Sequence, residues 1–276
     1  RRGLMQVTGA RRQITGFGNP TVKLLRSLRD KKHRRREQRF LAEGLRLLTD
    51  ARASGRLPEM LVMAEGRHPH PLLDELETAV LAAGGEVIET SAEVLSKITG
   101  KDNPQAICGV FAQWDTGLAR LDRAAAPIWL VAQAMRDPGN LGTMLRTGDA
   151  IGAGGLILID DCADPFSVEA VRASMGALFT VPLAQARWEE FIGWLRAGPG
   201  QLVAASLRDP FPYRAAPYAA PCFVMVGNES QGLPEEYEAA ADLRVTMPML
   251  GRADSLNAAV ASAVLGYEVL ARLGKG

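Results

Sequence analysis

Residues 136–160 read RDPGNLGTMLRTGDAIGAGGLILID. This stretch predicts a glycine-containing loop, an amphipathic helix and an apolar strand that ends on two acids. The segment before it, IWLVAQA at 128–134, is nearly all apolar, as is typical of a strand buried on both faces of a parallel sheet. The order strand, helix, strand therefore predicts an α/β domain with a parallel sheet.

The glycine loop does not match a dinucleotide-binding loop. Such a loop has the pattern G-x-G-x-x-G after a strand, with an acid about 20 residues further on. Asp160 or Asp161 lies at a suitable distance, but Gly139 and Gly142 are spaced G-x-x-G, and no G-K-[ST] element follows. A dinucleotide-dependent oxidoreductase stays an alternative that this spacing disfavours.

The loop and its helix carry polar residues in the pattern N-x-G-x-x-x-R, from Asn140 through Gly142 to Arg146. Asn140 can cap the helix, which would be a purely structural role. Arg146 lies opposite the apolar stripe of the helix, so core packing does not account for it. One turn separates it from Gly142, and we therefore expect it to share a surface with the open loop.

Two further polar clusters follow apolar strands. Gly227, Asn228 and Glu229 come after the strand FVMV, and Ser255 and Asn257 lie at the expected start of the last helix. A strand-end turn and an ordinary helix cap are the structural alternatives. Because ligands bind outside the carboxyl ends of parallel strands, we expect the clusters to meet in one site.

The N-terminal part alternates strands and helices as well, which predicts a separate α/β unit. We expect an N-terminal domain at 1–113, a linker at 114–126 and a C-terminal domain at 127–276. Expected strands of the first domain are 39–44, 60–65, 86–90 and 106–112, and the expected helices are 45–55, 71–85 and 91–98. In the second domain we expect strands at 128–134, 155–160, 201–206, 222–227 and 243–249, and helices at 140–153, 167–179 and 255–273.

Composition excludes several classes of protein. Cys108, Cys162 and Cys222 stand singly, which argues against a disulfide framework and a zinc site. All three histidines fall in the first quarter of the chain, so a His-based triad is not expected. No apolar run approaches the ~18–20 residues that span a bilayer. We expect no metal, no membrane partner and a cytoplasmic location.

Charge is distributed unevenly along the chain. Residues 1–39 hold 13 Lys and Arg residues against two acids, whereas the whole chain has a net charge of only +1. Such clustering is typical of a surface that binds a polyanion, most simply a nucleic acid. A solvated, disordered tail is the alternative. Apolar residues at Val22, Leu24, Leu25 and Leu28 have roughly helical spacing, which favours a segment that packs on the domain.

Taken together, the motifs resemble those of a known family. The stretches NLGTMLR (140–146), VGNESQG (226–232) and MPMLGRADSLN (247–257) look like the three motifs of the SpoU/TrmH family in the SPOUT superfamily of RNA methyltransferases. The segment DPFSVEAVRASMGALF (164–179) is similar to that family's stretch between its first two motifs. Residues 14–44 resemble the substrate-binding domain of ribosomal members, which is related to a ribosomal protein fold.

The resemblance implies an activity, a cofactor and partners. It implies transfer of the methyl group of S-adenosylmethionine to a ribose 2′-hydroxyl of RNA, with ribosomal RNA favoured and transfer RNA open. It also implies a trefoil knot in the C-terminal domain and a homodimer. A non-catalytic RNA-binding or ribosome-assembly protein is the alternative from another class.

The resemblance also assigns residues to these roles. Positions that match catalytic or substrate-orienting residues are Asn140, Arg146, Glu229, Ser255 and Asn257. Expected cofactor-binding residues are Ser206, Gly227, Asn228, Gly232, Met247 and Leu256, and expected RNA-binding residues are Lys23, Arg29, Lys31, Lys32, Arg34, Arg35 and Arg36.

Two roles are open for Arg146, that of a base and that of an electrostatic clamp. The family's matching arginine is often described as the base that takes the hydroxyl proton, yet a guanidinium stays protonated and is a poor base. We therefore favour Arg146 as a clamp on the neighbouring phosphate that also stabilises developing alkoxide charge. Ser255 and Asn257 would orient the ribose. Glu229 would hold Arg146 or loop backbone, or form a purely structural ion pair.

Overall fold

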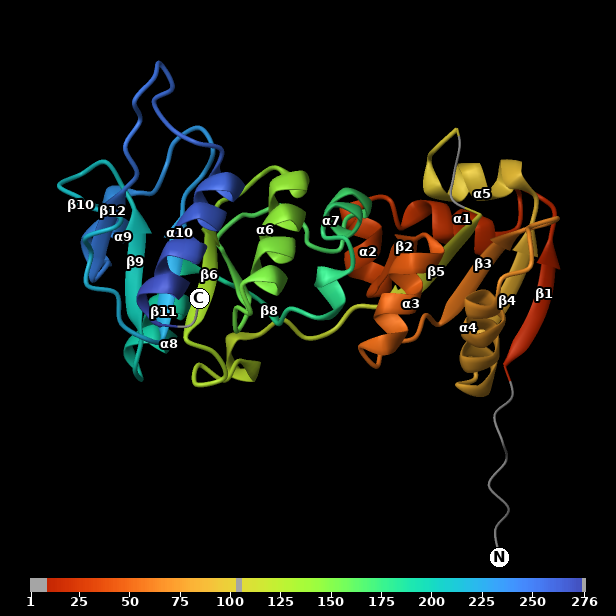
Figure 1. The fold of residues 1–276 in the computed structure, drawn as a ribbon. Coiled ribbons are helices and arrows are strands. Elements are labelled where there is room, and N and C mark those ends of the chain that lie inside the picture. The colour runs from red at the N-terminus through yellow and green to blue at the C-terminus, as the bar shows by residue number, and fades with distance from the viewer. Residues whose placement is uncertain (1–8, 103–105, 275–276) are drawn as a thin grey trace, which may run out of the picture. The chain divides into compact units, whose positions relative to one another are not determined.

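The computed structural model describes residues 9–102 and 106–274, so the first eight residues of the expected basic arm lie outside it. Its contacts divide the chain into two compact units, each built on its own sheet (Figure 1). The N-terminal unit contains the chain up to Trp114 together with Phe166–Arg172, and the C-terminal unit contains Asp115–Pro165 and the chain from Ala173 onward. The sequence motifs did not predict that residues 166–172 belong to the first unit.

The N-terminal unit contains a five-stranded mixed sheet. Its strands are β1 (Ala10–Ile14), β2 (Arg39–Glu43), β3 (Met60–Ala64), β4 (Glu86–Thr90) and β5 (Ile107–Ala112), in the order β1-β4-β3-β5-β2. β1, β4 and β3 run parallel, and β5 is antiparallel to both β3 and β2. β1 was not predicted, because four of its five residues are exposed and polar or small, as suits an edge strand.

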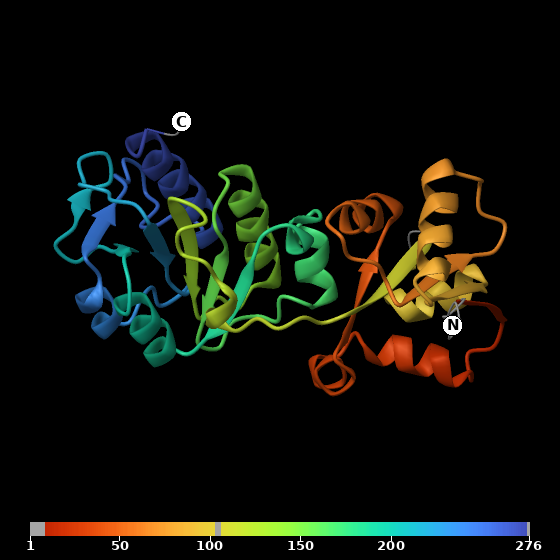
Figure 2. The ribbon, with the colours of Figure 1, turned by 90° about the horizontal axis from the view of Figure 1, so that it is seen from below.

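Helices cover both faces of this sheet. They are α1 (Pro20–Ser27), α2 (Lys31–Glu37), α3 (Leu45–Ala53), α4 (Pro71–Ala82) and α5 (Ala92–Thr99). Figure 2 shows α3 and α4 on one face and α1 and α2 on the other. Val22, Leu25 and Leu28 are buried in the core, so the basic segment packs on the unit as predicted. It forms two helices, because Asp30 caps α2 by accepting a hydrogen bond from the Lys32 backbone NH at 2.7 Å.

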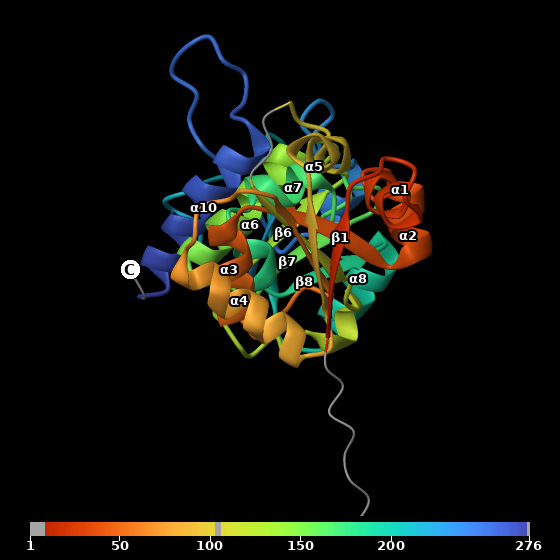
Figure 3. The same ribbon diagram turned by 90° about the vertical axis from the view of Figure 1, so that its right-hand side faces the viewer.

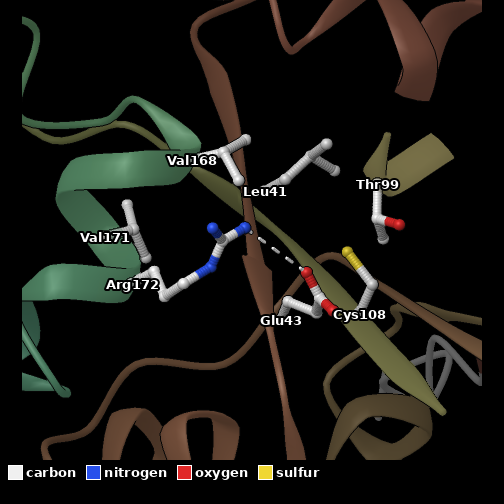
Figure 4. Close-up of a pocket in the computed structure, with 7 residues that line it drawn as sticks. All are labelled: Leu41, Glu43, Thr99, Cys108, Val168, Val171 and Arg172. Atoms are coloured by element: carbon white, nitrogen blue, oxygen red, sulfur yellow. Dashed lines mark ion pairs between the residues drawn. The ribbon is translucent and has the colours of Figure 1, made fainter. Parts of the chain in front are cut away.

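Residues 166–172 close one side of the N-terminal unit. Most of them lie in α7 (Val168–Ala173). The ring of Phe166 lies 5.0 Å from the rings of both Phe40 and Trp114. Arg172 pairs with Glu43 at 3.9 Å across a cavity of about 10 Å³ (Figure 4). A cavity of this size holds about one water molecule, so it is no ligand site.

The C-terminal unit contains a seven-stranded, fully parallel sheet. Its strands are β6 (Ile128–Gln133), β7 (Leu156–Ile159), β8 (Leu183–Ala186), β9 (Gln201–Ala205), β10 (Phe211–Pro212), β11 (Cys222–Val226) and β12 (Leu243–Thr246), in the order β10-β12-β9-β11-β6-β7-β8. Every residue of β6 and β11 is buried, which confirms the predicted parallel sheet with two covered faces.

Four helices cover this sheet, namely α6 (Pro138–Ala150), α8 (Trp188–Arg196), α9 (Glu235–Ala240) and α10 (Ala258–Arg272). Figure 2 shows α6 and α10 on one face and α8 and α9 on the other. Short 3₁₀ helices lie at Leu118–Arg120 and Ala177–Phe179. The helix predicted over 167–179 is therefore interrupted, and Met175 between its two pieces has a left-handed φ of 52°. β8, α8, β10 and α9 were not predicted.

The predicted linker is an ordered part of the C-terminal unit. Arg123 donates hydrogen bonds to the carbonyl oxygens of Trp194, Leu195 and Pro199, and its guanidinium lies 4.3 Å from the centre of the Trp194 ring. These carbonyls follow or end α8, so Arg123 satisfies acceptors that the helix leaves open. In the part of the chain that the structure describes, no helix is both long and apolar enough to cross a membrane.

Candidate active site

A cleft of about 530 Å³ lies at the carboxyl ends of the parallel strands of the C-terminal unit. Segments that follow β9, β11 and β12 line it, together with the start of α10. The segment after β12 is a long loop that stands out from the unit (Figure 3). A cleft of this volume suits a small organic ligand, for which sites of roughly 300–1,000 Å³ are common. All six expected cofactor-binding residues line it: Ser206, Gly227, Asn228, Gly232, Met247 and Leu256.

Bare backbone forms one wall of the cleft, at Gly227. A Cβ atom added to Gly227 would lie 2.4 Å from the carbonyl carbon of Gly232 and 2.5 Å from the Leu233 nitrogen. The backbone NH of Gly232 donates to the Asn228 carbonyl at 2.9 Å, and Gly232 has a φ of 67°, which favours glycine. Two turns of backbone therefore touch here, and only glycine fits at position 227.

Asn228 fixes this turn with its side chain. Its Oδ1 accepts from the backbone NH groups of Ser230 and Gln231, and its Nδ2 donates to the Ala134 carbonyl at 2.8 Å. Ala134 follows β6, so Asn228 joins the loop after β11 to the end of the neighbouring strand. Its amide is thus committed to shaping the cleft that it lines.

A chain of hydrogen bonds joins one residue from each of the three motifs. Asn257 Nδ2 donates to Asn140 Oδ1 at 3.0 Å, and Asn140 Nδ2 donates to Glu229 Oε1 at 3.3 Å. The same Glu229 oxygen accepts from the backbone NH of Asp137 at 3.4 Å. We call Asn140, Glu229 and Asn257 the amide network. It holds the loop before α6 and the start of α10 at one edge of the cleft.

The helix caps differ from the predicted ones. Asp137 caps α6, since its Oδ1 accepts from the Asn140 backbone NH at 2.8 Å. The capping role that was the structural alternative for Asn140 is therefore not observed, and its side chain is available for the amide network. Asn257 caps α10 by accepting from the backbone NH groups of Ala259 and Val260. Ser255, the expected cap, is exposed outside the helix and lines the cleft.

Arg146 lies outside the amide network. Its side chain is exposed on α6, and within residues 9–102 and 106–274 it forms no hydrogen bond or ion pair. Glu229 does not hold it; that carboxylate instead binds Asn140 and the loop backbone, which was the other predicted possibility. Arg146 is therefore free to meet a ligand from solvent.

Other reactive groups of the C-terminal unit are committed to structure. Asp160 accepts hydrogen bonds from Tyr237 Oη at 2.7 Å, the Trp188 NH at 3.0 Å and Gln133 Nε2 at 3.2 Å. It is therefore not the free acid that a dinucleotide ribose would need, and Asp161, the other candidate, pairs with Arg136 at 3.6 Å.

The three cysteines are poor nucleophiles. Burial raises the pKa of Cys108 and Cys222 to about 12 and that of Cys162 to about 11. The charge of Glu43 adds to the shift at Cys108. Since the thiolate is the reactive form, these thiols stay unreactive at neutral pH. Among the described residues, no group of three or more His, Cys, Asp or Glu side chains could hold a metal ion.

The N-terminal unit carries most of the predicted RNA-binding residues on α1, α2 and the turn between them. Lys23, Arg29, Lys32, Arg35 and Arg36 are exposed and Lys31 is half-buried, and we call these six the basic surface. Arg34 departs from the prediction. It is only 3% exposed, and its Nη1 donates to the carbonyls of Leu28 at 2.9 Å and Arg29 at 2.7 Å. Its guanidinium satisfies the end of α1 and is not available to RNA.

The cleft also contains charged residues that the sequence did not reveal. Arg208 follows β9 and pairs with Glu235 at 2.7 Å and with Glu238 at 3.0 Å. Ser206 Oγ accepts from the Arg208 NH at 3.0 Å, so the predicted Ser206 shapes this loop. Neither Arg208 nor Glu238 lies in one of the three motifs, and no spacing pattern marks them.

Comparisons with known proteins agree with this geometry. The SpoU rRNA Methylase family matches residues 127–267, and an MRM3-like substrate binding domain matches residues 19–109. The 23S rRNA (guanosine(2553)-2′-O)-methyltransferase RlmP of Bacillus subtilis is 32% identical over 259 residues, covering 94% of this chain and 99% of that protein. The mitochondrial rRNA methyltransferase 3 of Homo sapiens is 26% identical, covering 85% of this chain and 68% of that protein.

Two solved methyltransferase structures match nearly the whole length of the chain. The AdoMet-bound rRNA methyltransferase from Sinorhizobium meliloti has a TM-score of 0.89 and 40% identity, covering 95% of this chain and 98% of that one. The SpoU methyltransferase AviRb from Streptomyces viridochromogenes, in complex with the cofactor AdoMet, has a TM-score of 0.85 and 26% identity, covering 94% and 99%. Both likenesses extend over the two units and the cleft.

Proposed function

The chain belongs to the SpoU rRNA methylase family, and on that premise we propose how its residues share the methylation of a ribose 2′-hydroxyl in ribosomal RNA. The protein is an S-adenosylmethionine-dependent RNA 2′-O-methyltransferase. One observation carries the assignment of residues: the second and third motifs line one cleft, and hydrogen bonds join Asn140 of the first motif to Glu229 and Asn257 at its edge.

The cleft fits the cofactor in volume and in the nature of its walls. Its volume of about 530 Å³ suits a nucleoside with a short amino-acid tail. Gly227, Met247 and Leu256 would hold the cofactor, largely through backbone groups. Position 227 offers only backbone, because a side chain there would clash with the backbone of Gly232 and Leu233. When bound, S-adenosylmethionine supplies a methyl group that its sulfonium already activates.

The residues around the cleft must then align the hydroxyl and stabilise the charge that develops on its oxygen. Alignment of reacting groups can contribute about 7–11 kcal/mol. The amide network fixes two loops at this edge, and Ser255 is exposed beside Asn257 where it can orient the ribose. Arg146 would bind the adjacent phosphate, and its guanidinium would stabilise negative charge without acting as the base.

RNA affinity comes from a different part of the chain. Phosphate contacts usually dominate the affinity of proteins for nucleic acid, and the basic surface presents exposed lysines and arginines for them. We propose that it holds the folded ribosomal RNA, whose unpaired regions let a protein reach individual riboses.

We also propose that two copies associate through α10. Val260, Val264 and Tyr267 are 47%, 38% and 55% exposed, and their spacing places them on one face of the helix. An exposed apolar stripe of this kind favours a protein interface. Sedimentation of the purified chain should give the mass of two copies. The trefoil knot that the family resemblance implies stays a prediction.

The activity is tested with labelled S-adenosylmethionine and total ribosomal RNA. We expect label in alkali-resistant dinucleotides, since a 2′-O-methyl group blocks alkaline cleavage at that ribose. Arg146→Ala should lose the label but keep its affinity for S-adenosylhomocysteine, because Arg146 does not line the cleft. Label only in transfer RNA would contradict the proposed substrate. No label in either RNA would make the protein a non-catalytic RNA binder.

A further inference from the structure

A buried carboxylate faces the cleft from α9. Glu238 is 6% exposed and lines the cleft, and its Oε2 has no hydrogen-bond partner in the described part of the chain. This oxygen lies 3.0 Å from Arg208 Nε, which makes an ion pair without hydrogen-bond geometry. Buried polar atoms normally have a hydrogen-bond partner, and one that lacks it points to a missing ligand or to another specific role.

Glu238 shares its arginine partner with a second carboxylate. Arg208 also binds Glu235 at 2.7 Å, and this neighbour raises the pKa of Arg208. In this ion pair the Glu238 carboxylate faces the Arg208 guanidinium. An ionised carboxylate can only accept hydrogen bonds, so the ligand group that meets it must be a donor.

The sheet order shows which end of the cleft Glu238 occupies. β9 lies on the side of β11 away from β6. Arg208, the partner of Glu238, follows β9, whereas Asn140 of the amide network follows β6. The two groups therefore reach the cleft from opposite sides of β11. If the methyl group is to meet the RNA ribose beside the amide network, the nucleoside of the cofactor extends toward Glu238.

We propose that Glu238 accepts hydrogen bonds from the ribose hydroxyls of S-adenosylmethionine, an inference that rests on the proposed function. Two neighbouring hydroxyls are neutral donors, and burying them costs less than burying the charged amino-acid tail. The tail stays hydrated near Ser255 and Leu256, where the cleft is exposed. Glu238 is thus a cofactor-binding residue that selects a ribonucleoside.

The test uses calorimetric titration, which needs no RNA and no turnover. Glu238→Met removes the acceptor at similar volume, and Glu238→Gln keeps the shape and one weaker acceptor. Glu235→Gln is the matched control, because Glu235 pairs with the same arginine but does not line the cleft. Thermal unfolding of each variant reports whether it is folded.

The expected effects are graded. Loss of a hydrogen bond to a charged group should weaken S-adenosylhomocysteine binding about tenfold to a hundredfold in Glu238→Met. Glu238→Gln should fall between this variant and the wild type, and Glu235→Gln should bind within about twofold of the wild type. The 2′-deoxy and 3′-deoxy analogues of 5′-methylthioadenosine should bind the wild type more weakly than the parent nucleoside. Glu238→Met should not distinguish them, which gives a double-mutant cycle.

Three outcomes would overturn the inference or its premise. Glu238 variants that weaken S-adenosylhomocysteine but not 5′-methylthioadenosine would assign Glu238 to the ammonium of the tail. Unchanged binding of both compounds would make Glu238 a structural ion-pair residue only. Failure of the wild type to bind S-adenosylhomocysteine at all would overturn the proposed function itself.

Discussion

In the proposed function, the cleft of the C-terminal unit and the basic surface of the N-terminal unit act on the same RNA, but their side chains differ in kind. The amide network consists of short side chains that bind one another at 3.0 and 3.3 Å. The basic surface consists of long cations that are mostly exposed. Chemistry at one ribose needs groups held in place, whereas phosphate contacts act over distance and tolerate mobile side chains. The chain thus places the alignment of the reacting groups in one unit and the affinity for RNA in the other.

We expect the largest effect from a substitution at Gly227, which lines the cleft. Gly227→Ala would place a Cβ 2.4 Å from the backbone of Gly232 and force two segments of main chain apart. We expect affinity for S-adenosylhomocysteine to fall about a hundredfold, measured by calorimetry. RNA affinity, measured by filter binding, should stay unchanged. Gly251→Ala is a control, because nothing lies within 4 Å of a Cβ there.

Arg34 lies among the cations of α2, but its side chain is buried like that of a core residue. Arg34→Ala would leave the carbonyls of Leu28 and Arg29 without this donor. We expect a loss of about 2–3 kcal/mol in the free energy of unfolding, measured by urea denaturation. Lys32→Ala on the same helix is exposed and should cost less than about 0.5 kcal/mol. Equal effects would contradict the structural role of Arg34.

Asn257→Asp tests the amide network without disturbing the helix. Aspartate keeps the oxygen that caps α10 but loses the NH₂ group that donates to Asn140. We expect kcat to fall about tenfold with little change in thermal stability. Asn257→Ala should lose activity and, through the lost cap, also about 1 kcal/mol of stability. Wild-type turnover by Asn257→Asp would show that the network does not position the reacting groups.

The smallest effect is expected for the combined variant Lys32→Ala, Arg35→Ala and Arg36→Ala, which leaves Arg34 in place. RNA affinity at 0.15 M salt should fall about fivefold, and the slope of log affinity against log salt should decrease by roughly two to three. Turnover at saturating RNA should match the wild type, because no residue of the cleft changes. A lower turnover with unchanged affinity would place these cations in the active site and contradict their proposed role in RNA affinity.

Much of the site could be predicted because its signals are local. Apolar strands followed by Gly227 to Glu229 and by Ser255 to Asn257 identify the carboxyl edge of a parallel sheet, where the structure places the cleft. All six cofactor-binding residues that the family resemblance implied line that cleft. Buried strands such as β6 and β11 were predictable because burial on both faces leaves a continuous apolar run.

Other features depend on partners that are distant in sequence. Arg34 looks like its neighbours in the chain, and only the turn that brings it under the end of α1 buries it. Glu238 and Arg208 belong to no motif, since each acts through the other. The helix caps are Asp137 and Asn257, whereas Asn140 and Ser255 were the structural alternatives for this role, because these residue types have similar capping propensity.

Phe166–Arg172 limits how the chain can be divided into its two units. These seven residues complete the N-terminal unit, where Phe166 covers Phe40 and Trp114, although they are encoded within the C-terminal half of the chain. The polypeptide therefore passes from one unit to the other three times. A gene fragment ending at Trp114 would encode an RNA-binding unit that lacks part of its wall. The two units therefore cannot be separated by a single cut in the chain.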